Sequence, residues 1–151
     1  MKLRRTTSRD VDFIALTQRF DRELRAEYGD EVEDVYAQYN VVDTETVVVA
    51  SIDEVAAGCG CFKRYDAETI ELKRFYVDPA RRGAGVGRAV IGALEAWAIE
   101  LGYRAAVLET GTRQAAAIAL YERAGYQRTP LYGPYVGMEL SICMRKQLVA
   151  S

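Results

Sequence analysis

The chain has 151 residues, of which 50% are apolar and 28% are charged, and its formal net charge is −2. This length fits one folded domain, so we predict a single domain over residues 1–151. An isoelectric point near 5.3 argues against nonspecific binding of nucleic acid by the whole surface. The sequence contains no histidine, which excludes Ser-His-Asp and Cys-His catalysis and histidine-based metal sites.

The N-terminal segment is charged, and no apolar run in the sequence reaches the length that a membrane helix needs. We therefore expect a cytoplasmic protein that has neither a membrane nor a nucleic acid as its partner. Cys59 and Cys61 lie two residues apart in an expected strand, which favours buried, reduced thiols over a disulfide.

Apolar periodicity and turn signals divide the chain into alternating helices and strands. The expected elements are a short strand over 2–6, helices over 11–28 and 32–39, strands over 46–49, 55–63 and 70–77, a long helix from 86 to about 101, a strand over 105–108, a helix over 114–124 and a final strand over 140–144. Gly58 and Gly60 indicate a bulge or a close approach within one strand. This order predicts an α/β domain with a mixed sheet of six to seven strands and about four helices.

A basic glycine loop joins the strand over 70–77 to the long helix. It reads Arg-Arg-Gly-Ala-Gly-Val-Gly-Arg from Arg81 to Arg88. Glycines let a ligand approach the backbone closely, and the unpaired N–H groups and dipole of a helix N-terminus attract anions. The loop therefore predicts a site for a pyrophosphate group.

The spacing of the glycines narrows the choice of pyrophosphate ligand. A Walker loop has Lys and then Ser or Thr after its last glycine, whereas Arg88 and Ala89 follow Gly87. A dinucleotide loop has glycines at its first, third and sixth positions near the first strand, whereas here they occupy the first, third and fifth positions deep in the chain. ADP and NAD are therefore disfavoured, and a helix-start turn without any ligand is the structural alternative.

Two motifs resemble those of the GNAT superfamily of N-acetyltransferases. Residues 82–87 match its central motif, an Arg or Gln, two further residues, Gly, one residue, then Gly or Ala. Residues 117–126 are similar to its later motif, an Ala-Ile-x-Leu-Tyr helix that ends in Gly and an aromatic residue. The resemblance covers roughly residues 46–144 and implies a single-domain GNAT fold with a central, mostly antiparallel sheet. It also implies an acyltransferase with acetyl-CoA as cosubstrate and no metal.

The resemblance assigns a cofactor site. Backbone groups of Phe75, Tyr76 and Val77 would hold the pantetheine arm. Gln114 occupies a position where the family often has Asn, and its amide offers the same hydrogen-bonding groups. The loop amides would hold the pyrophosphate, and they belong to Arg82, Gly83, Ala84, Gly85, Val86, Gly87 and Arg88.

The resemblance also implies two catalytic residues. Tyr121 matches the family tyrosine that donates a proton to the departing CoA thiolate, and the alternative is a tyrosine of the core. Glu71 stands where several members carry a glutamate that accepts the proton of the amine, and the alternative is an ion pair with Lys73. Strand alternation would place Glu71 on the same face as Phe75 and Val77 unless a bulge intervenes.

The loop before the last strand carries Tyr132 and Tyr135, which would shape the acceptor pocket unless they belong to a rigid turn. The predicted function is transfer of an acetyl group from acetyl-CoA to a primary amine of an unidentified small molecule, directly within a ternary complex. The alternatives are a protein or peptide N-acetyltransferase and a non-catalytic acyl-CoA-binding regulatory module. A homodimer is common in the family and is kept as an expectation.

Overall fold

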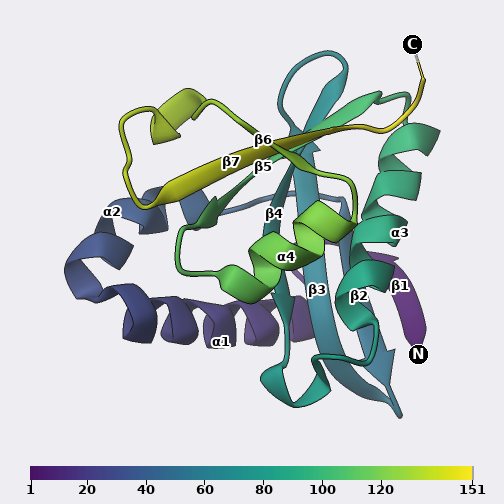
Figure 1. Ribbon diagram of the computed structural model, residues 1–151. Helices are drawn as coiled ribbons and strands as arrows, with labels where there is room; N and C mark the ends of the chain where they lie inside the picture. Colours follow the sequence, from purple (N-terminus) through teal and green to yellow (C-terminus); the bar gives the residue numbers. More distant parts are fainter. Residues whose placement is uncertain (151) are drawn as a thin grey trace. The chain divides into compact units, whose positions relative to one another are not determined.

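The computed structural model describes residues 1–150, which form one mixed seven-stranded sheet and four α-helices (Figure 1). The strand order is β1-β2-β3-β4-β5-β7-β6. The strands are β1 (Lys2–Thr6), β2 (Val47–Ile52), β3 (Val55–Arg64), β4 (Thr69–Val77), β5 (Ala105–Gly111), β6 (Gln127–Thr129) and β7 (Ser141–Gln147). The helices are α1 (Val11–Tyr28), α2 (Asp30–Asn40), α3 (Val86–Glu100) and α4 (Ala115–Arg123), with short 3-10 turns at η1 (Pro79–Arg81) and η2 (Gly133–Tyr135). The β4–β5 pair is parallel, whereas β1–β2, β2–β3, β5–β7 and β6–β7 are antiparallel, which confirms the predicted fold class.

The chain that builds this sheet divides into two compact units. The first unit consists of residues 1–61 and 74–94. The second consists of residues 62–73 and the chain from Glu95 onward. The boundaries fall inside β3, β4 and α3, and a single domain over residues 1–151 stays a prediction.

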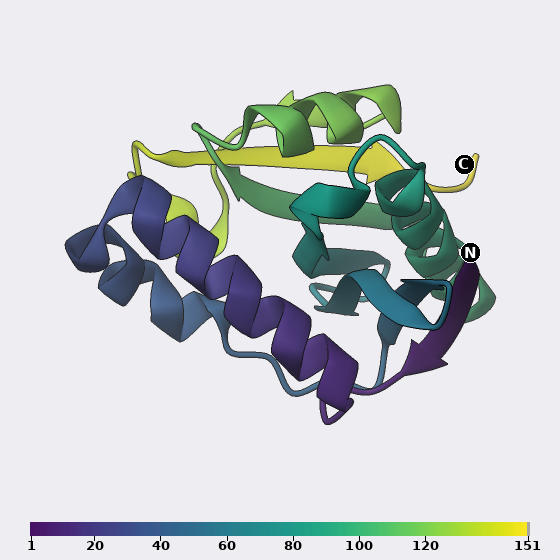
Figure 2. The same ribbon diagram turned by 90° about the horizontal axis from the view of Figure 1, so that it is seen from below.

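In the first unit, helix α1 begins at Asp10, whose carboxylate accepts hydrogen bonds from the backbone N–H groups of Asp12 and Phe13 at 2.9 and 3.2 Å. The guanidinium of Arg4 contacts the same carboxylate and lowers the pKa of Asp10 to about 2. Gly29 ends α1 with a φ of 87°, as predicted, and α2 then runs beside α1 (Figure 2). The predicted bounds of α1 are confirmed, and α2 is longer by two residues at its start and one at its end.

Helix α1 covers one face of the strands in this unit. A buried cluster joins it to β2, β3 and β4, and its members are Phe13, Leu16, Val47, Val49, Cys59, Cys61 and Tyr76. The rings of Phe20 and Tyr76 also stack with their centroids 5.3 Å apart. Both cysteines of this cluster are fully buried and in no disulfide, which confirms the prediction of reduced core thiols.

The first half of helix α3 lies against the opposite face of β3, and glycine makes this contact possible. A Cβ atom on Gly58 would lie 2.7 Å from Val86 Cγ1, and one on Gly60 would lie 2.9 Å from Leu94 Cδ1. Real carbon atoms do not approach so closely, so larger side chains here would push the helix away. The close approach predicted from these two glycines is confirmed, and a register shift at Ala50/Ser51 of the neighbouring strand lies opposite Gly58.

Strand β4 is irregular at Arg74, which has a φ of 53°. The side chain of Arg74 is buried and donates hydrogen bonds to Asp21 Oδ1 at 2.6 Å and to the carbonyl oxygen of Thr17 at 3.1 Å. Positive φ is costly for a residue with a Cβ atom, so these contacts with α1 hold a strained backbone. The backbone therefore departs from regular strand geometry at Arg74, between Glu71 and Val77, where the sequence left a bulge open.

In the second unit, residues 69–72 of β4 pair in parallel with residues 105–108 of β5. Strand β5 extends three residues past its predicted end because Glu109, Thr110 and Gly111 pair with β7. The edge strand β6 was not predicted, since three residues are too few to show an alternating pattern. Tertiary pairing therefore decides where these strands end.

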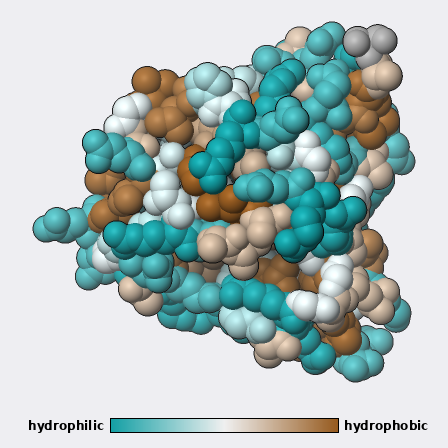
Figure 3. Space-filling view, in the orientation of Figure 1, coloured by the Kyte–Doolittle hydropathy of each residue, from teal (hydrophilic) through white to brown (hydrophobic). Residues whose placement is uncertain are grey.

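Large apolar side chains that remain exposed are scattered over β1, α1, α2, β3, α3 and the loops. On the face drawn in Figure 3, apolar residues occur in small groups among hydrophilic ones. Within residues 1–150, none of the helices combines the length and the apolar character that a membrane span requires.

We expect the substitution Gly58→Ala to lower the free energy of unfolding by about 1–3 kcal/mol, because overpacking costs this much. The added methyl group would lie 2.7 Å from Val86 and 3.1 Å from the carbonyl oxygen of Tyr76. Urea unfolding measures the change.

Gly92→Ala in helix α3 is the matched control. Gly92 is exposed, and nothing lies within 4 Å of the position of its Cβ atom. Alanine should therefore stabilise the helix there by about 0.5–1 kcal/mol. Equal unfolding midpoints for the two variants would contradict the close approach.

Candidate functional site

The glycine loop lies between η1 and α3 in the first unit. Gly83 and Gly85 have φ values of 87° and 82°, a backbone region that favours glycine. Nothing lies within 4 Å of the Cβ position of either glycine, so the space beside the loop is open. Val86 and Gly87 are buried at the helix start, and no acidic residue occupies the first turn of α3. The loop thus has the backbone shape, the free space and the helix dipole that an anion needs.

Arg82 does not project freely from this loop. Its Nε donates a hydrogen bond to the carbonyl oxygen of Val77 at 3.2 Å, and its Nη2 lies 3.5 Å from Glu23 Oε1 of α1. Burial and then a hydrogen bond to Glu23 raise the pKa of Tyr76 to about 12. Through Glu23, helix α1 therefore contacts both the end of β4 at Tyr76 and Arg82 of the glycine loop.

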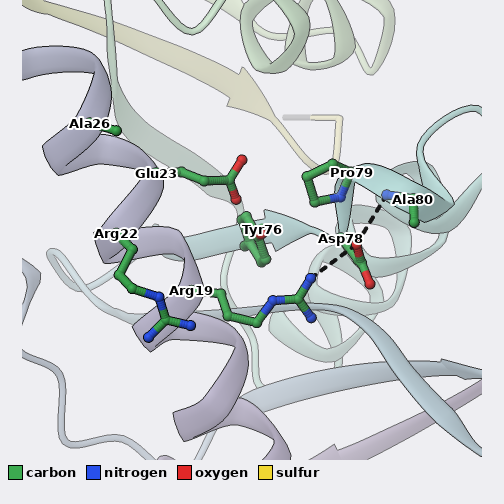
Figure 4. Close-up of a pocket in the computed structure, with 8 residues that line it drawn as sticks. All are labelled: Arg19, Arg22, Glu23, Ala26, Tyr76, Asp78, Pro79 and Ala80. Carbon is green, nitrogen blue, oxygen red and sulfur yellow. Dashed lines mark hydrogen bonds and ion pairs between the residues drawn. The ribbon is translucent and has the colours of Figure 1, made fainter.

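A cavity of about 550 Å³ lies beside these contacts of Glu23, between α1 and the end of β4 (Figure 4). Four of its lining residues, Arg19, Arg22, Glu23 and Ala26, recur on one face of α1, and the others are Tyr76, Asp78, Pro79 and Ala80. Arg19 pairs with Asp78 at 3.1 Å, and Asp78 also accepts a hydrogen bond from the backbone N–H of Ala80. Of the predicted site residues only Tyr76 lines this cavity. On the same strand β4, Phe75 is half-buried and Val77 is buried.

Gln114 begins α4 in the second unit, and its side chain does not cap that helix. Its Oε1 atom is the one buried side-chain oxygen or nitrogen among residues 1–150 without a hydrogen-bond partner. An unpaired buried carbonyl oxygen costs free energy until a donor reaches it. Gln114 therefore offers an acceptor to a ligand that carries an N–H or O–H group.

Tyr121 is buried on the inner side of α4, in edge-to-face contact with the ring of Tyr126. Burial raises the pKa of the Tyr121 hydroxyl above its ordinary value, and the negative charge of Glu109 raises it further. The phenol therefore keeps its proton throughout the neutral and moderately basic range. It is suited to donate a proton rather than to accept one.

Glu71 is buried in the second unit, where the structure brings it together with the predicted aromatic loop. Tyr132 Oη donates a hydrogen bond of 2.6 Å to Glu71 Oε2. The ammonium groups of Lys63 and Lys73 each lie 3.8 Å from Glu71 Oε1. Burial, followed by the charge of Glu71, raises the pKa of Tyr132, so the hydroxyl stays a donor in this contact.

Tyr135 is buried beside this group, with its ring in edge-to-face contact with that of Tyr132 at 5.7 Å. Both predicted acceptor tyrosines therefore lie next to the predicted carboxylate. The ion pair with Lys73, which the sequence left as an alternative for Glu71, is present as well.

Sequence reasoning missed Glu109, which is half-buried on β5. Its Oε2 atom accepts a hydrogen bond of 2.7 Å from Ser141 Oγ, and its charge acts on both Tyr121 and Cys143. Ligands commonly bind beyond the carboxyl ends of parallel strands, and β5 pairs in parallel with β4. A carboxylate near the end of such a strand was a usable signal, but the predicted strand stopped one residue before it.

Burial is the main reason that the pKa of Cys143 rises to about 11. The negative charges of Glu109 and Glu71 both act on the thiol of Cys143 and raise its pKa further. Burial likewise raises the pKa of Cys59. At neutral pH these two sulfurs are protonated thiols and therefore weak nucleophiles.

The second unit thus combines a protonated phenol, two carboxylates and an unpaired amide oxygen. Such groups can accept a proton from a nucleophile and donate one to a leaving group. In the first unit, the glycine loop has a shape that suits an anion.

Comparison with known proteins agrees with this chemistry. The family model "Acetyltransferase (GNAT) family" matches residues 13–126. The chain is 38% identical over 103 residues to the IAA acetyltransferase of Azospirillum brasilense, a match that covers 67% of each protein.

Two solved structures share the fold. One is a Klebsiella pneumoniae protein described as an acyl-CoA N-acyltransferase, with a TM-score of 0.81, 31% identity and coverage of 98% of this chain and 97% of that one. The other is the acetyltransferase YncA of Salmonella typhimurium with its cofactor acetyl-CoA, with a TM-score of 0.68, 21% identity and coverage of 100% and 95%.

The family model covers most of the chain, and both motifs on which the resemblance rested lie within the matched residues. The chain therefore belongs to the GNAT acetyltransferase family and is an acetyl-CoA-dependent N-acetyltransferase.

Proposed function

We propose that this enzyme transfers the acetyl group of acetyl-CoA to the primary amine of a small molecule, directly within a ternary complex. The observation that carries the proposal is the contact of Tyr132 with Glu71, because it joins the candidate base to the candidate acceptor loop. The raised pKa of Cys143 supports direct transfer, since a thiol that stays protonated does not readily form an acyl-enzyme.

The residues of the chain fit the cofactor. The open backbone at Gly83 and Gly85 and the N-terminus of α3 would receive the pyrophosphate. The unpaired oxygen of Gln114 would accept a hydrogen bond from an amide N–H of the pantetheine arm. When bound, acetyl-CoA supplies an activated acetyl thioester.

In this proposal Tyr121 protonates the departing sulfur. Burial raises the pKa of its hydroxyl above the ordinary value, so the phenol holds its proton at neutral pH. Glu71 accepts the proton that the amine must lose, and Glu109 is the second carboxylate that could do so. A non-catalytic acyl-CoA-binding module would need none of these three groups, so their presence favours the enzyme.

Several finer expectations stay predictions: the small-molecule character of the acceptor, the absence of a metal, the cytoplasmic location and the homodimer. Acetylation of a peptide amine in preference to any small amine would replace the first of them. An amine panel assayed with acetyl-CoA and a free-thiol readout tests the proposed activity as a whole.

We expect Gly85→Val to weaken CoA binding by about tenfold or more, equivalent to about 1.4 kcal/mol. The β-branched side chain would occupy the open space where the pyrophosphate is proposed to lie and would disfavour the present φ of 82°. Isothermal titration with CoA measures the loss of affinity.

Gly29→Val is the matched control. Gly29 has a φ of 87° and equally open surroundings, but it joins α1 to α2 rather than forming part of the loop. The two variants should lose similar thermal stability, and only Gly85→Val should lose CoA affinity. Unchanged affinity in folded Gly85→Val would remove the loop from the cofactor site.

We expect Tyr121→Phe and Glu71→Gln each to lower kcat by about 10²–10⁴-fold, with different pH profiles. Since the raised pKa of Tyr121 keeps the phenol protonated across the assay range, the loss in Tyr121→Phe should not depend on pH. Glu71→Gln should recover partly at high pH, where more of the amine is neutral and needs no base. Steady-state measurement of kcat and kcat/KM over about pH 6–10 tests both expectations.

Glu109→Gln belongs in the same series, and Glu68→Gln is the control because Glu68 is an exposed carboxylate of the same unit. If Glu109→Gln lowers kcat and recovers at high pH while Glu71→Gln does neither, Glu109 is the base and Glu71 orients the tyrosine loop. CoA affinity should stay near the wild-type value in all these variants.

A further inference from the structure

Strand β4 contains a residue in a conformation that strands do not use. Arg74 has a φ of 53° and immediately precedes residues 75–77, which lead towards the glycine loop. Within residues 1–150, the other non-glycine residues with positive φ are Asp53 and Glu54, which form the two-residue turn between β2 and β3. Positive φ is ordinary in such a turn, whereas inside a strand it persists only where the surroundings hold it.

The side chain of Arg74 is held by one face of helix α1. Its Nη2 atom donates hydrogen bonds to Asp21 Oδ1 at 2.6 Å and to the carbonyl oxygen of Thr17 at 3.1 Å. The guanidinium also lies over the ring of Phe20, 5.2 Å from its centroid. The Arg74 side chain is 5% exposed, so a loss of these contacts would leave a buried charge without a partner.

The backbone of Arg74 is held by strand β3. The thiol of Cys59 donates a weak hydrogen bond to the carbonyl oxygen of Arg74, with the sulfur 3.6 Å from that oxygen. Burial raises the pKa of this thiol, so it remains a donor. At the end of β4, the backbone N–H of Asp78 donates to the carbonyl oxygen of Ala57 at 2.8 Å. The peptide groups on both sides of residues 75–77 are therefore fixed to the same neighbouring strand.

The strand end after Arg74 is linked to the glycine loop within the same unit. The carbonyl oxygen of Val77 accepts a hydrogen bond of 3.2 Å from Arg82 Nε. The Tyr76 hydroxyl is hydrogen-bonded to Glu23, which also lies 3.5 Å from Arg82 Nη2. A change in the backbone conformation of Arg74 would displace the residues that make these contacts with the loop.

We propose that Arg74 and Asp21 are positioning residues for the cofactor, because their ion pair holds β4 in the conformation in which the end of this strand and the glycine loop bind CoA. Neither side chain touches CoA in this proposal. The inference rests on the proposed function, since it assumes that the loop receives the pyrophosphate. Without the ion pair, residue 74 would favour a negative φ, and CoA would bind only the fraction of molecules that keep the present conformation.

The test compares Arg74→Ala with Arg74→Gly. Both substitutions remove the contacts with α1, but glycine adopts a φ of 53° without the crowding of a Cβ atom. Arg74→Ala should weaken CoA binding by about 5- to 30-fold, the population shift that corresponds to the cost of an unsupported positive φ. Arg74→Gly should bind CoA with an affinity closer to that of the wild type. Isothermal titration with CoA provides the measurement.

A role of Arg74 in stability alone predicts a different order, because glycine weakens a strand more than alanine does. Thermal unfolding of both variants therefore accompanies the titrations. In the acetylation assay, Arg74→Ala should raise KM for acetyl-CoA more than it lowers kcat, since the reacting groups are unchanged.

Asp21 variants test the same ion pair from the helix. The Asp21 side chain is 54% exposed on α1, where alanine is well tolerated, so Asp21→Ala serves even if the Arg74 variants do not fold. Asp21→Ala should weaken CoA binding in the same direction as Arg74→Ala. Asp21→Asn keeps an acceptor oxygen for the guanidinium and should retain most of the affinity.

Two matched controls lie in the same unit. Asp53→Ala and Asp53→Gly change a residue with a φ of 50° in the β2–β3 turn, so they repeat the backbone comparison away from the loop. Asp30→Asn weakens the ion pair of 2.9 Å that joins Arg25 of α1 to α2. These variants should keep the wild-type affinity for CoA.

The outcomes separate this inference from the proposed function. Equal loss of CoA affinity in folded Arg74→Ala and Arg74→Gly would overturn the inference, because the backbone conformation would then not matter. Wild-type affinity in folded Asp21→Ala would overturn it as well. If the variants bind CoA as expected but no amine is acetylated, the proposed function is overturned and the positioning role stands. If the wild type does not bind CoA, both are overturned.

Discussion

The contact of helix α3 with strand β3 is the constraint on which the position of the glycine loop in the first unit depends. Gly58 and Gly60 leave no side chain between the helix and the strand, so Val86 and Leu94 reach the strand itself. The start of α3 is thereby held against the sheet, and the loop before it is short and rich in glycine. Because the helix begins at a fixed place, its free N–H groups and dipole act at a defined point in space.

Helix α1 contributes a second restraint from the opposite face of the strands. Asp21 and Thr17 hold the buried guanidinium of Arg74, and Glu23 reaches both Tyr76 and Arg82. The strained backbone at Arg74 therefore lies in the same strand that leads into the glycine loop. Binding sites that need accurate geometry commonly rest on such held irregularities, since a regular strand offers no free backbone groups to a ligand.

The second unit concentrates polar chemistry in a largely buried setting. Glu71 accepts a short hydrogen bond from Tyr132 while two ammonium groups lie near its other oxygen, and Ser141 orients Glu109. Burial separates the roles of these groups, because it keeps the phenols and the Cys143 thiol protonated while the carboxylates remain paired. A reaction that must move one proton from an amine and one to a sulfur requires donors and acceptors that differ in this way.

The order and type of the longer elements could be predicted from the sequence alone, because amphipathic helices and glycine turns are recognised from the spacing of nearby apolar residues and glycines. Helix α1 and its end at Gly29, the glycine loop and the start of α3 are examples, and the two motifs were sufficient to indicate the family.

The short strand β6 and the full length of β5 required the structure, since their hydrogen-bond partners lie far away in the chain. The positive φ at Arg74 depends on contacts with a helix more than fifty residues earlier in the chain, so no local sequence pattern could predict it. For the same reason, only the tertiary structure decided that Tyr132 and Lys73 lie beside Glu71 and that Glu109 acts on Tyr121, because charges and hydrogen bonds depend on distance in space rather than on separation in sequence.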